Sequence, residues 1–92
     1  MGVTSFDFDS VKSKVEAALR KQLPHDTIDV SPGYEGRAHV LVVSAEFNGM
    51  AEEQKQEYVW RILKSELAQD APAVSFVLVY GTDELRHDVE PD

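Results

Sequence analysis

The chain of 92 residues contains no cysteine, a single tryptophan, and only five glycines and four prolines. The lack of cysteine excludes disulfide bonds, catalysis by a thiol and metal sites built from cysteines. The scarcity of glycine and proline excludes a collagen-like or low-complexity chain. The longest aliphatic run, 40–43, is far shorter than the ~20 apolar residues that cross a membrane. Residues 1–9 show no signal-peptide pattern, so we expect a cytoplasmic protein without a membrane span.

Basic residues are also outnumbered, because nine Lys and Arg stand against 17 Asp and Glu for a formal net charge of −8. The imbalance is concentrated at the two ends of the chain. Residues 1–9 hold two acids and no Lys or Arg, and residues 83–92 hold five acids against Arg86. The remaining body is nearly balanced. The acidity therefore favours solubility and argues only weakly against nucleic-acid partners.

The length and the composition, with 42% hydrophobic and 28% charged residues, predict one globular domain. We expect this domain to span 10–86. A flexible lead-in at 1–9 precedes it, and an acidic tail at 87–92 follows it.

Apolar residues in steps of three and four predict two amphipathic helices, at 10–23 and 50–69. Pro24 ends the first helix because proline has no amide hydrogen for the helical ladder. The second helix has one broad apolar sector, which holds Tyr58, Val59, Trp60, Ile62, Leu63 and Leu67. Its first two turns, 52–57, carry almost no apolar residue, and we expect them to project into solvent.

Three strands are predicted at 27–31, 39–44 and 74–80. Apolar residues on both faces of 39–44 indicate a central strand that helices cover. The last strand alternates so that one face holds Val74, Phe76, Leu78 and Tyr80. Thr82 is expected to cap a short turn after it. The order helix, strand, strand, helix, strand predicts an α+β domain, with two main helices packed on a three-stranded mixed sheet.

Among the three histidines, His25 and His87 are expected to be solvated, and His39 is the one that suggests chemistry. His39 opens the central strand after a loop that carries Tyr34, Glu35 and Arg37, where an imidazole can bind a metal ion or act as a base. The commoner interpretation is a strand-edge histidine with ordinary hydrogen bonds. No histidine has the spacing of a zinc or calcium motif, and no serine lies in a Gly-x-Ser-x-Gly elbow. A small enzyme that uses His39 with Glu35 is a remote alternative.

Two features bear on nucleic-acid binding. Residues 33–36 fit the Gly-x-x-Gly pattern of KH domains, but the inner residues Tyr34 and Glu35 are not basic, which favours a plain hairpin turn. The first helix carries four bases against Glu16, namely Lys12, Lys14, Arg20 and Lys21. This basic face is either a solvated helix surface or a site for an acidic partner or a nucleic-acid backbone.

The central segment resembles the BolA-like family. The residues that carry the resemblance are the strand 39–44 with His39 at its start, the turn 47–49 (Phe-Asn-Gly), and the leucine spacing of the second helix up to Leu67. The segment 81–84 is similar to the Thr-Pro-Glu stop of the family. The likeness covers about residues 11–85, and the order of elements also resembles a type II KH domain.

The resemblance implies a BolA-like, type II KH-like fold and a non-enzymatic role as an interaction or regulatory protein. It further implies a monothiol glutaredoxin as the first partner to consider, with a shared two-iron two-sulfur cluster. The chain departs from the family where Lys55-Gln56-Glu57 replaces an Arg-His-Arg triplet and where Val74 stands closest to a C-terminal histidine. His39 is thus the single candidate metal ligand. The candidate partner-binding residues, placed beside the start of the second helix, are Tyr34, Arg37, His39, Lys55 and Arg61. A KH-like nucleic-acid-binding module is the alternative function.

Overall fold

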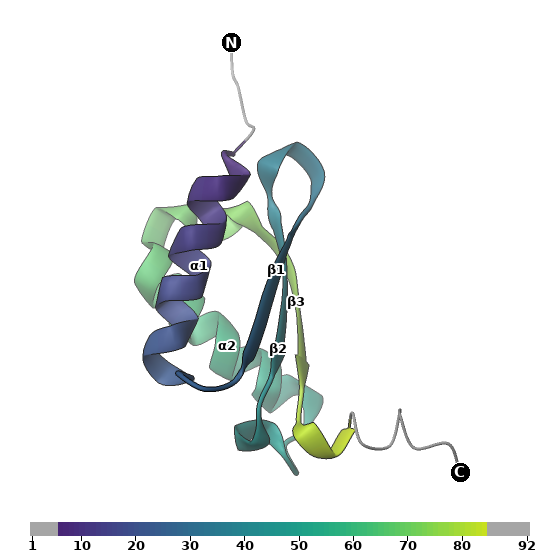
Figure 1. The fold of residues 1–92 in the computed structure, drawn as a ribbon. Helices are drawn as coiled ribbons and strands as arrows, with labels where there is room; N and C mark the ends of the chain where they lie inside the picture. Colours follow the sequence, from purple (N-terminus) through teal and green to yellow (C-terminus); the bar gives the residue numbers. More distant parts are fainter. Residues whose placement is uncertain (1–5, 85–92) are drawn as a thin grey trace, which may run out of the picture.

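Two helices pack against one face of a three-stranded sheet in the computed structural model, which describes residues 6–84 (Figure 1). The helices and strands are α1 (Phe8–Gln22), β1 (Thr27–Pro32), β2 (Ala38–Val43), α2 (Glu52–Leu67) and β3 (Val74–Tyr80). The predicted α+β class and the order of elements are confirmed. The expected tail at 87–92, with His87, and residues 1–5 of the expected lead-in lie outside the described residues. Neither α1 nor α2 is long and apolar enough to cross a membrane.

The sheet is mixed, with β2 in the centre. β1 pairs with β2 in antiparallel fashion, so that Thr27 lies opposite Val43, and β3 pairs with β2 in parallel, so that Tyr80 also lies opposite Val43. A short hairpin joins β1 to β2, whereas the parallel pair requires a crossover connection, which α2 supplies.

α1 begins at Phe8, two residues before the predicted start, because the preceding segment packs instead of extending into solvent. Phe6 and Phe8 lie against the core, and the backbone N–H of Phe6 donates to the carbonyl of Glu35 at 2.8 Å. Residues 6–9 therefore belong to the packed structure.

At the other end of α1, the guanidinium of Arg20 binds the carbonyls that follow the helix, at Leu23, Pro24 and Asp26.

The core lies between the helices and the sheet. The predicted stripes are buried, with α1 contributing Val11, Val15, Ala18 and Leu19 and α2 contributing Val59, Leu63 and Leu67. The sheet supplies alternate residues that include Val40, Val42, Val77 and Val79. This spacing follows from the helical and strand periods, which place every second strand residue and every third or fourth helix residue on one side.

The expectation that the first turns of α2 project into solvent is wrong for Lys55 and Gln56, whereas the other four residues of 52–57 are exposed. The side chain of Lys55 is only 3% exposed, and the amide of Gln56 donates to the carbonyl of Val77 in β3 at 2.8 Å. Polar side chains anchor this end of the helix to the sheet and to the segment after it, so an apolar pattern does not reveal the contact.

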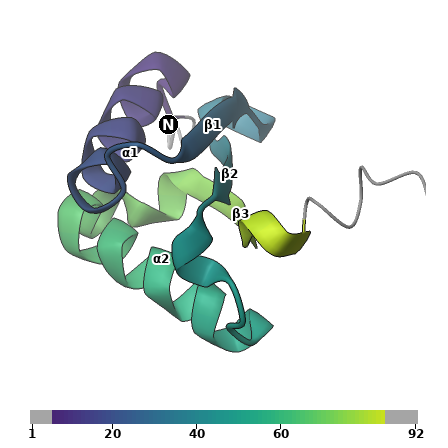
Figure 2. The same ribbon diagram turned by 60° about the horizontal axis from the view of Figure 1, so that its bottom comes forward.

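Helices cover only one of the two apolar faces of β2 within the described residues. Both helices lie on the same side of the sheet in the two views, and no described helix covers the other side (Figures 1 and 2). The prediction that Val74 shares one face of β3 with Phe76, Leu78 and Tyr80 is wrong for Val74. The pairing shifts by one residue between Ala38 and His39, so Val74 is buried in the core while Phe76 and Leu78 lie on the uncovered side. A bulge of this kind moves the side chains after it to the opposite face.

Two glycines with left-handed backbone give a matched test of the packing at the loop before β2. Gly36 has φ +79° and Gly49 has φ +80°, but a Cβ at Gly36 would collide with the carbonyl of Phe6, whereas a Cβ at Gly49 meets nothing within 4 Å. We expect Gly49→Ala to lower the free energy of unfolding by about 1–2 kcal/mol, the cost of a left-handed alanine. Gly36→Ala carries the collision in addition and is expected to be the less stable of the two in urea unfolding. Equal losses in the two variants would show that Phe6 does not pack on this loop.

Candidate partner-binding face

The uncovered side of the sheet, called the open face below, consists of three rows of residues that lie opposite one another across the strands. Strand pairing places directly opposed side chains on the same face, within contact distance of one another. The rows are Ser31–His39–Phe76, Asp29–Leu41–Leu78 and Thr27–Val43–Tyr80. β2 and β3 thus give the open face an apolar surface, and β1 gives it a polar border.

Aromatic rings meet in the first row. The imidazole of His39 stacks on the ring of Phe76, with the centroids 4.1 Å apart and the planes inclined by 22°. The imidazole also lies close to Gly33, where an added Cβ would stand 2.7 Å from Nε2. Phe76 is 44% exposed, so the outer part of its ring is available to another molecule.

A shallow hollow of about 230 Å³ lies between the first two rows. Its lining consists of Asp29, Ser31, His39, Val40, Leu41, Phe76 and Leu78. Leu78 is 45% exposed, and the exposed Asp29 forms no ion pair with any residue in 6–84. The hollow therefore offers an aromatic wall, an aliphatic surface and one uncompensated carboxylate.

The loop before β2 is a tight hairpin connection, as its sequence favours. Tyr34 is 78% exposed, and Glu35 adopts a left-handed φ of 54°. The guanidinium of Arg37 lies 5.7 Å from the centre of the Phe6 ring, and its Nε is buried without a hydrogen-bond partner in the described part of the chain. Arg37 is thus turned toward the N-terminal segment.

The five predicted partner-binding residues do not form one surface, and the placement of Tyr34, Arg37 and His39 beside the start of α2 is wrong. Tyr34, Arg37 and His39 lie at the amino end of β2, whereas α2 begins at the opposite end of the sheet, past the carboxyl end of β3 (Figure 1). Lys55 is buried there. Arg61 lies farther along α2, exposed, with its Nη2 3.8 Å from Glu57. The parallel crossover explains the separation, because α2 must start where β2 ends.

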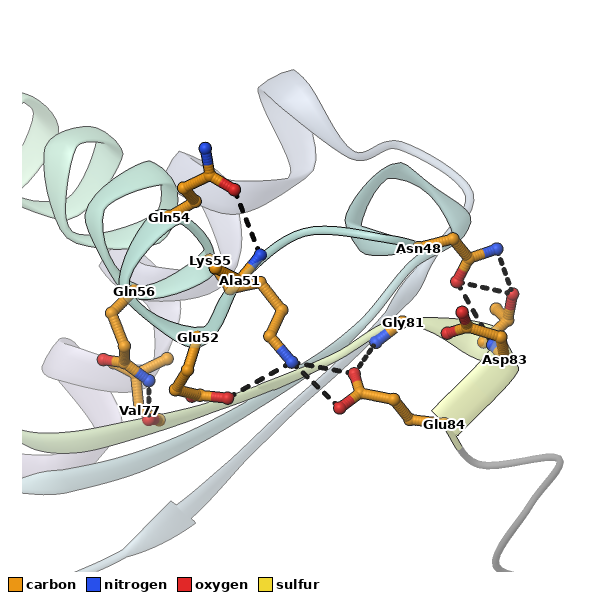
Figure 3. A network of polar contacts seen from close by, with 11 residues as sticks. Asn48, Ala51, Glu52, Gln54, Lys55, Gln56, Val77, Gly81, Asp83 and Glu84 are labelled. Atoms are coloured by element: carbon orange, nitrogen blue, oxygen red, sulfur yellow. Dashed lines mark hydrogen bonds and ion pairs between the residues drawn. The ribbon is translucent and has the colours of Figure 1, made fainter.

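Lys55 is the centre of a polar network at the carboxyl end of the sheet (Figure 3). Its Nζ lies 2.8 and 3.0 Å from the two carboxylate oxygens of Glu84 and 3.2 Å from Glu52. Glu84 also accepts the N–H of Gly81 at 2.7 Å, so its side chain caps the turn 81–84. Asn48 Oδ1 accepts the N–H of Asp83 at 3.1 Å. Glu84 and Asn48 thus cap the turn, a role that the sequence assigned to Thr82.

Three of the four basic residues predicted to form a basic face on α1 bind other groups of this chain. Lys14 pairs with Asp70 at 2.7 Å, and Lys21 pairs with Glu66 at 2.9 Å, so both lysines join α1 to the segment from α2 onward. Arg20 binds the carbonyls after its own helix. These contacts are reasons for basic residues at these positions that need no nucleic acid.

Two larger hollows lie along α2, of about 290 and 450 Å³. Arg61 lines both, and most of the remaining lining consists of polar side chains such as Ser65, Glu66 and Lys64. Trp60 borders the second, but its indole N–H is already bound to Gln56 Oε1 at 3.1 Å. The open face is the stronger candidate because its large apolar side chains are exposed and in register.

The residues present do not fit a resident iron–sulfur cluster. The segment 6–84 contains no group of three or more His, Cys, Asp or Glu side chains that could hold a metal ion. The position opposite His39 on β3 is the ring of Phe76, which cannot act as a ligand. No hydrogen bond within residues 6–84 joins His39 to Glu35, the pair named in the catalytic alternative.

No family model, curated protein or solved structure matches this chain. The BolA-like relationship therefore stays a prediction from the resemblance of short motifs. The architecture and the residues of the open face carry the functional argument.

Sequence reasoning found only His39 among the residues of the hollow and missed the others, among them Asp29, Phe76 and Leu78. The alternation of 74–80 contained part of the signal, because the two apolar faces of a strand cannot both be buried when helices cover one side of the sheet. The side that the helices take is a tertiary property that the alternation does not contain.

The Lys55–Glu84 pair makes a specific prediction for acid stability. The hydrogen bond from Lys55 holds the pKa of Glu84 below its usual 4.5, with the N–H of Gly81 adding to the effect. Because the folded pKa lies below the unfolded one, the pair contributes stability above pH 4.5 and loses it as the pH falls through the folded pKa. We expect Glu84→Gln to lower the urea midpoint at neutral pH, and its deficit relative to wild type to shrink below pH 4.5.

Glu46→Gln, which removes an exposed carboxylate outside the ion pairs in 6–84, serves as the control and should leave the acid limb unchanged. At the alkaline end, the hydrogen bond to Glu84 raises the pKa of Lys55 above 10.5, so its contribution persists to pH 10.5 and disappears above the folded value. A Glu84→Gln deficit that is the same at every pH would contradict this role.

Proposed function

We propose that this chain is a non-enzymatic, BolA-like interaction domain that binds a partner protein through the open face. The observation that carries the proposal is the exposure of Phe76 and Leu78, 44% and 45%, on a sheet face that neither α1 nor α2 covers. Exposed apolar side chains that are contiguous mark binding surfaces more often than scattered ones do. Here Leu41 and His39 extend the same surface in register.

The composition of the open face supports a protein partner. An aromatic and aliphatic centre with a polar border is the usual anatomy of a protein interface, in which a few large side chains provide most of the binding energy. Phe76, Leu78 and Leu41 form that centre, and Asp29 and Ser31 form the border on β1.

The BolA-like resemblance gives a monothiol glutaredoxin as the first partner to test, and we place this interaction in the cytoplasm, as expected from the sequence. The proposal does not include a cluster held by this chain, because His39 stands alone against Phe76. A partner that brings its own cluster ligands is compatible with it.

The KH-like alternative, binding of single-stranded nucleic acid, has one observation in its favour. Stacked rings on an open sheet, here His39 and Phe76, are a platform on which bases stack in RNA-binding domains. Against it, the hollow beside the rings contains a carboxylate and no Lys or Arg, and Lys14, Lys21 and Arg20 are engaged elsewhere. We therefore favour a protein partner.

A photo-crosslinker on the open face tests the proposed function. We expect a benzoylphenylalanine in place of Leu78 to yield a discrete crosslink to a second protein in extracts of the source cells and to a purified monothiol glutaredoxin, if that is the partner. The same group in place of Glu53, exposed in the first turn of α2, is the matched control and should give no such product. Identical products from the two positions, or none from position 78, would refute the open face as the docking surface.

A further inference from the structure

We propose that the hollow on the open face binds an arginine side chain presented by the partner protein. This inference rests on the proposed function and adds the chemistry by which the partner is recognised. It follows from three properties of the hollow: its apolar surface, its single carboxylate and its aromatic wall.

The apolar surface fits the stem of a long cationic side chain. Leu41 and Leu78 lie opposite each other in the middle row of the sheet, and both line the hollow. Lysine and arginine side chains combine an aliphatic stem with a charged head, and they cover apolar surface with the stem while the head stays polar. A volume of about 230 Å³ suits one such side chain and not a helix or a strand.

The carboxylate lies at the end of the same row. Asp29 is opposite Leu41, it is exposed, and it forms no ion pair with residues 6–84. The lining includes no Lys or Arg that would repel a cation. A cationic head above Leu41 therefore meets a carboxylate that no ion pair within residues 6–84 occupies.

The aromatic wall and the carboxylate together favour arginine over lysine. Phe76 and His39 border the hollow as a stacked pair of rings. A guanidinium packs against aromatic rings and binds a carboxylate through two parallel N–H groups, whereas an ammonium group offers no such fork. The hydroxyl of Ser31, in the row of Phe76, offers a further acceptor.

Charge also distinguishes an arginine of a partner protein from two other possible occupants of the open face, a second copy of this chain and a nucleic acid. In a two-fold dimer through the open face, the same patch would face itself, which would bring two copies of Asp29 together with no Lys or Arg in the lining to compensate them. A nucleic acid would bring phosphates to the same carboxylate. An arginine of a partner protein is the occupant that uses the apolar surface, the carboxylate and the aromatic wall together.

Titration of the ¹⁵N-labelled full chain with capped tripeptides tests the inference. The probes are Leu-Arg-Leu, Leu-Lys-Leu and Leu-citrulline-Leu, the last of which keeps the shape of arginine without its charge. We expect the arginine peptide to shift the amide signals of Asp29, Leu41 and Leu78, with weaker binding of the lysine peptide and the weakest binding of the citrulline peptide. Asp29→Asn should weaken the arginine peptide about three- to tenfold. Glu46→Gln, which removes one charge beyond the opposite end of β2, should not.

Three results would overturn the inference. They are equal binding of the arginine and citrulline peptides, unchanged binding to a folded Asp29→Asn variant, and shifts confined to other surfaces. A concentration-dependent dimer that Leu78→Asp abolishes would identify a second copy as the occupant, and salt-sensitive binding of a single-stranded oligonucleotide on the same signals would identify nucleic acid. If position 78 crosslinks to a partner but the peptides show no preference for arginine, this inference alone is refuted. If neither a crosslink nor a preference for arginine is found, the proposed function is refuted as well.

Discussion

The parallel pairing of β2 with β3 is the constraint on which the rest of this structure depends. A parallel pair needs a crossover from one end of the sheet to the other, and α2 is that crossover. Because α2 packs on the side that α1 already occupies, the two helices share one core, and no helix of residues 6–84 covers the opposite face of the sheet (Figure 2). The open face follows from this pairing. So does the position of Lys55 at the carboxyl end of the sheet, far from Tyr34 and His39 at the amino end of β2.

The Lys55 network shows how the crossover is fixed at its start. A buried ammonium loses its hydration, and several polar partners must compensate for that loss. Glu84 and Glu52 supply the countercharges, and Glu84 simultaneously caps the turn that ends the described chain. The same side chain thus joins the beginning of α2 to the end of β3, two points that lie far apart in sequence and side by side in space (Figure 3).

Much of the fold could be predicted from local pattern, because helix and strand periods alone place residues such as Val15, Leu63 and Val42 in the core. The bulge that turns Val74 away from Phe76 could not, because it depends on pairing with β2 rather than on residues 74–80. The burial of Lys55 depends on Glu84, 29 residues later, and no rule of sequence spacing connects them. Of the candidate site, only His39 was both predicted and found on the open face. In the sequence, Asp29 is a polar residue between Ile28 and Val30, and only the pairing of β1 with β2 shows that it lies beside Leu41.

The contact between Gln56 and Val77 has a consequence for solubility. β3 is an edge strand that carries two exposed apolar side chains, a combination that invites an incoming strand and growth of the sheet into an aggregate. The amide of Gln56 occupies the carbonyl of Val77 in the middle of that edge, and an incoming strand would have to displace it. The fold can therefore expose an apolar sheet face while its backbone edge is partly closed to further copies of itself.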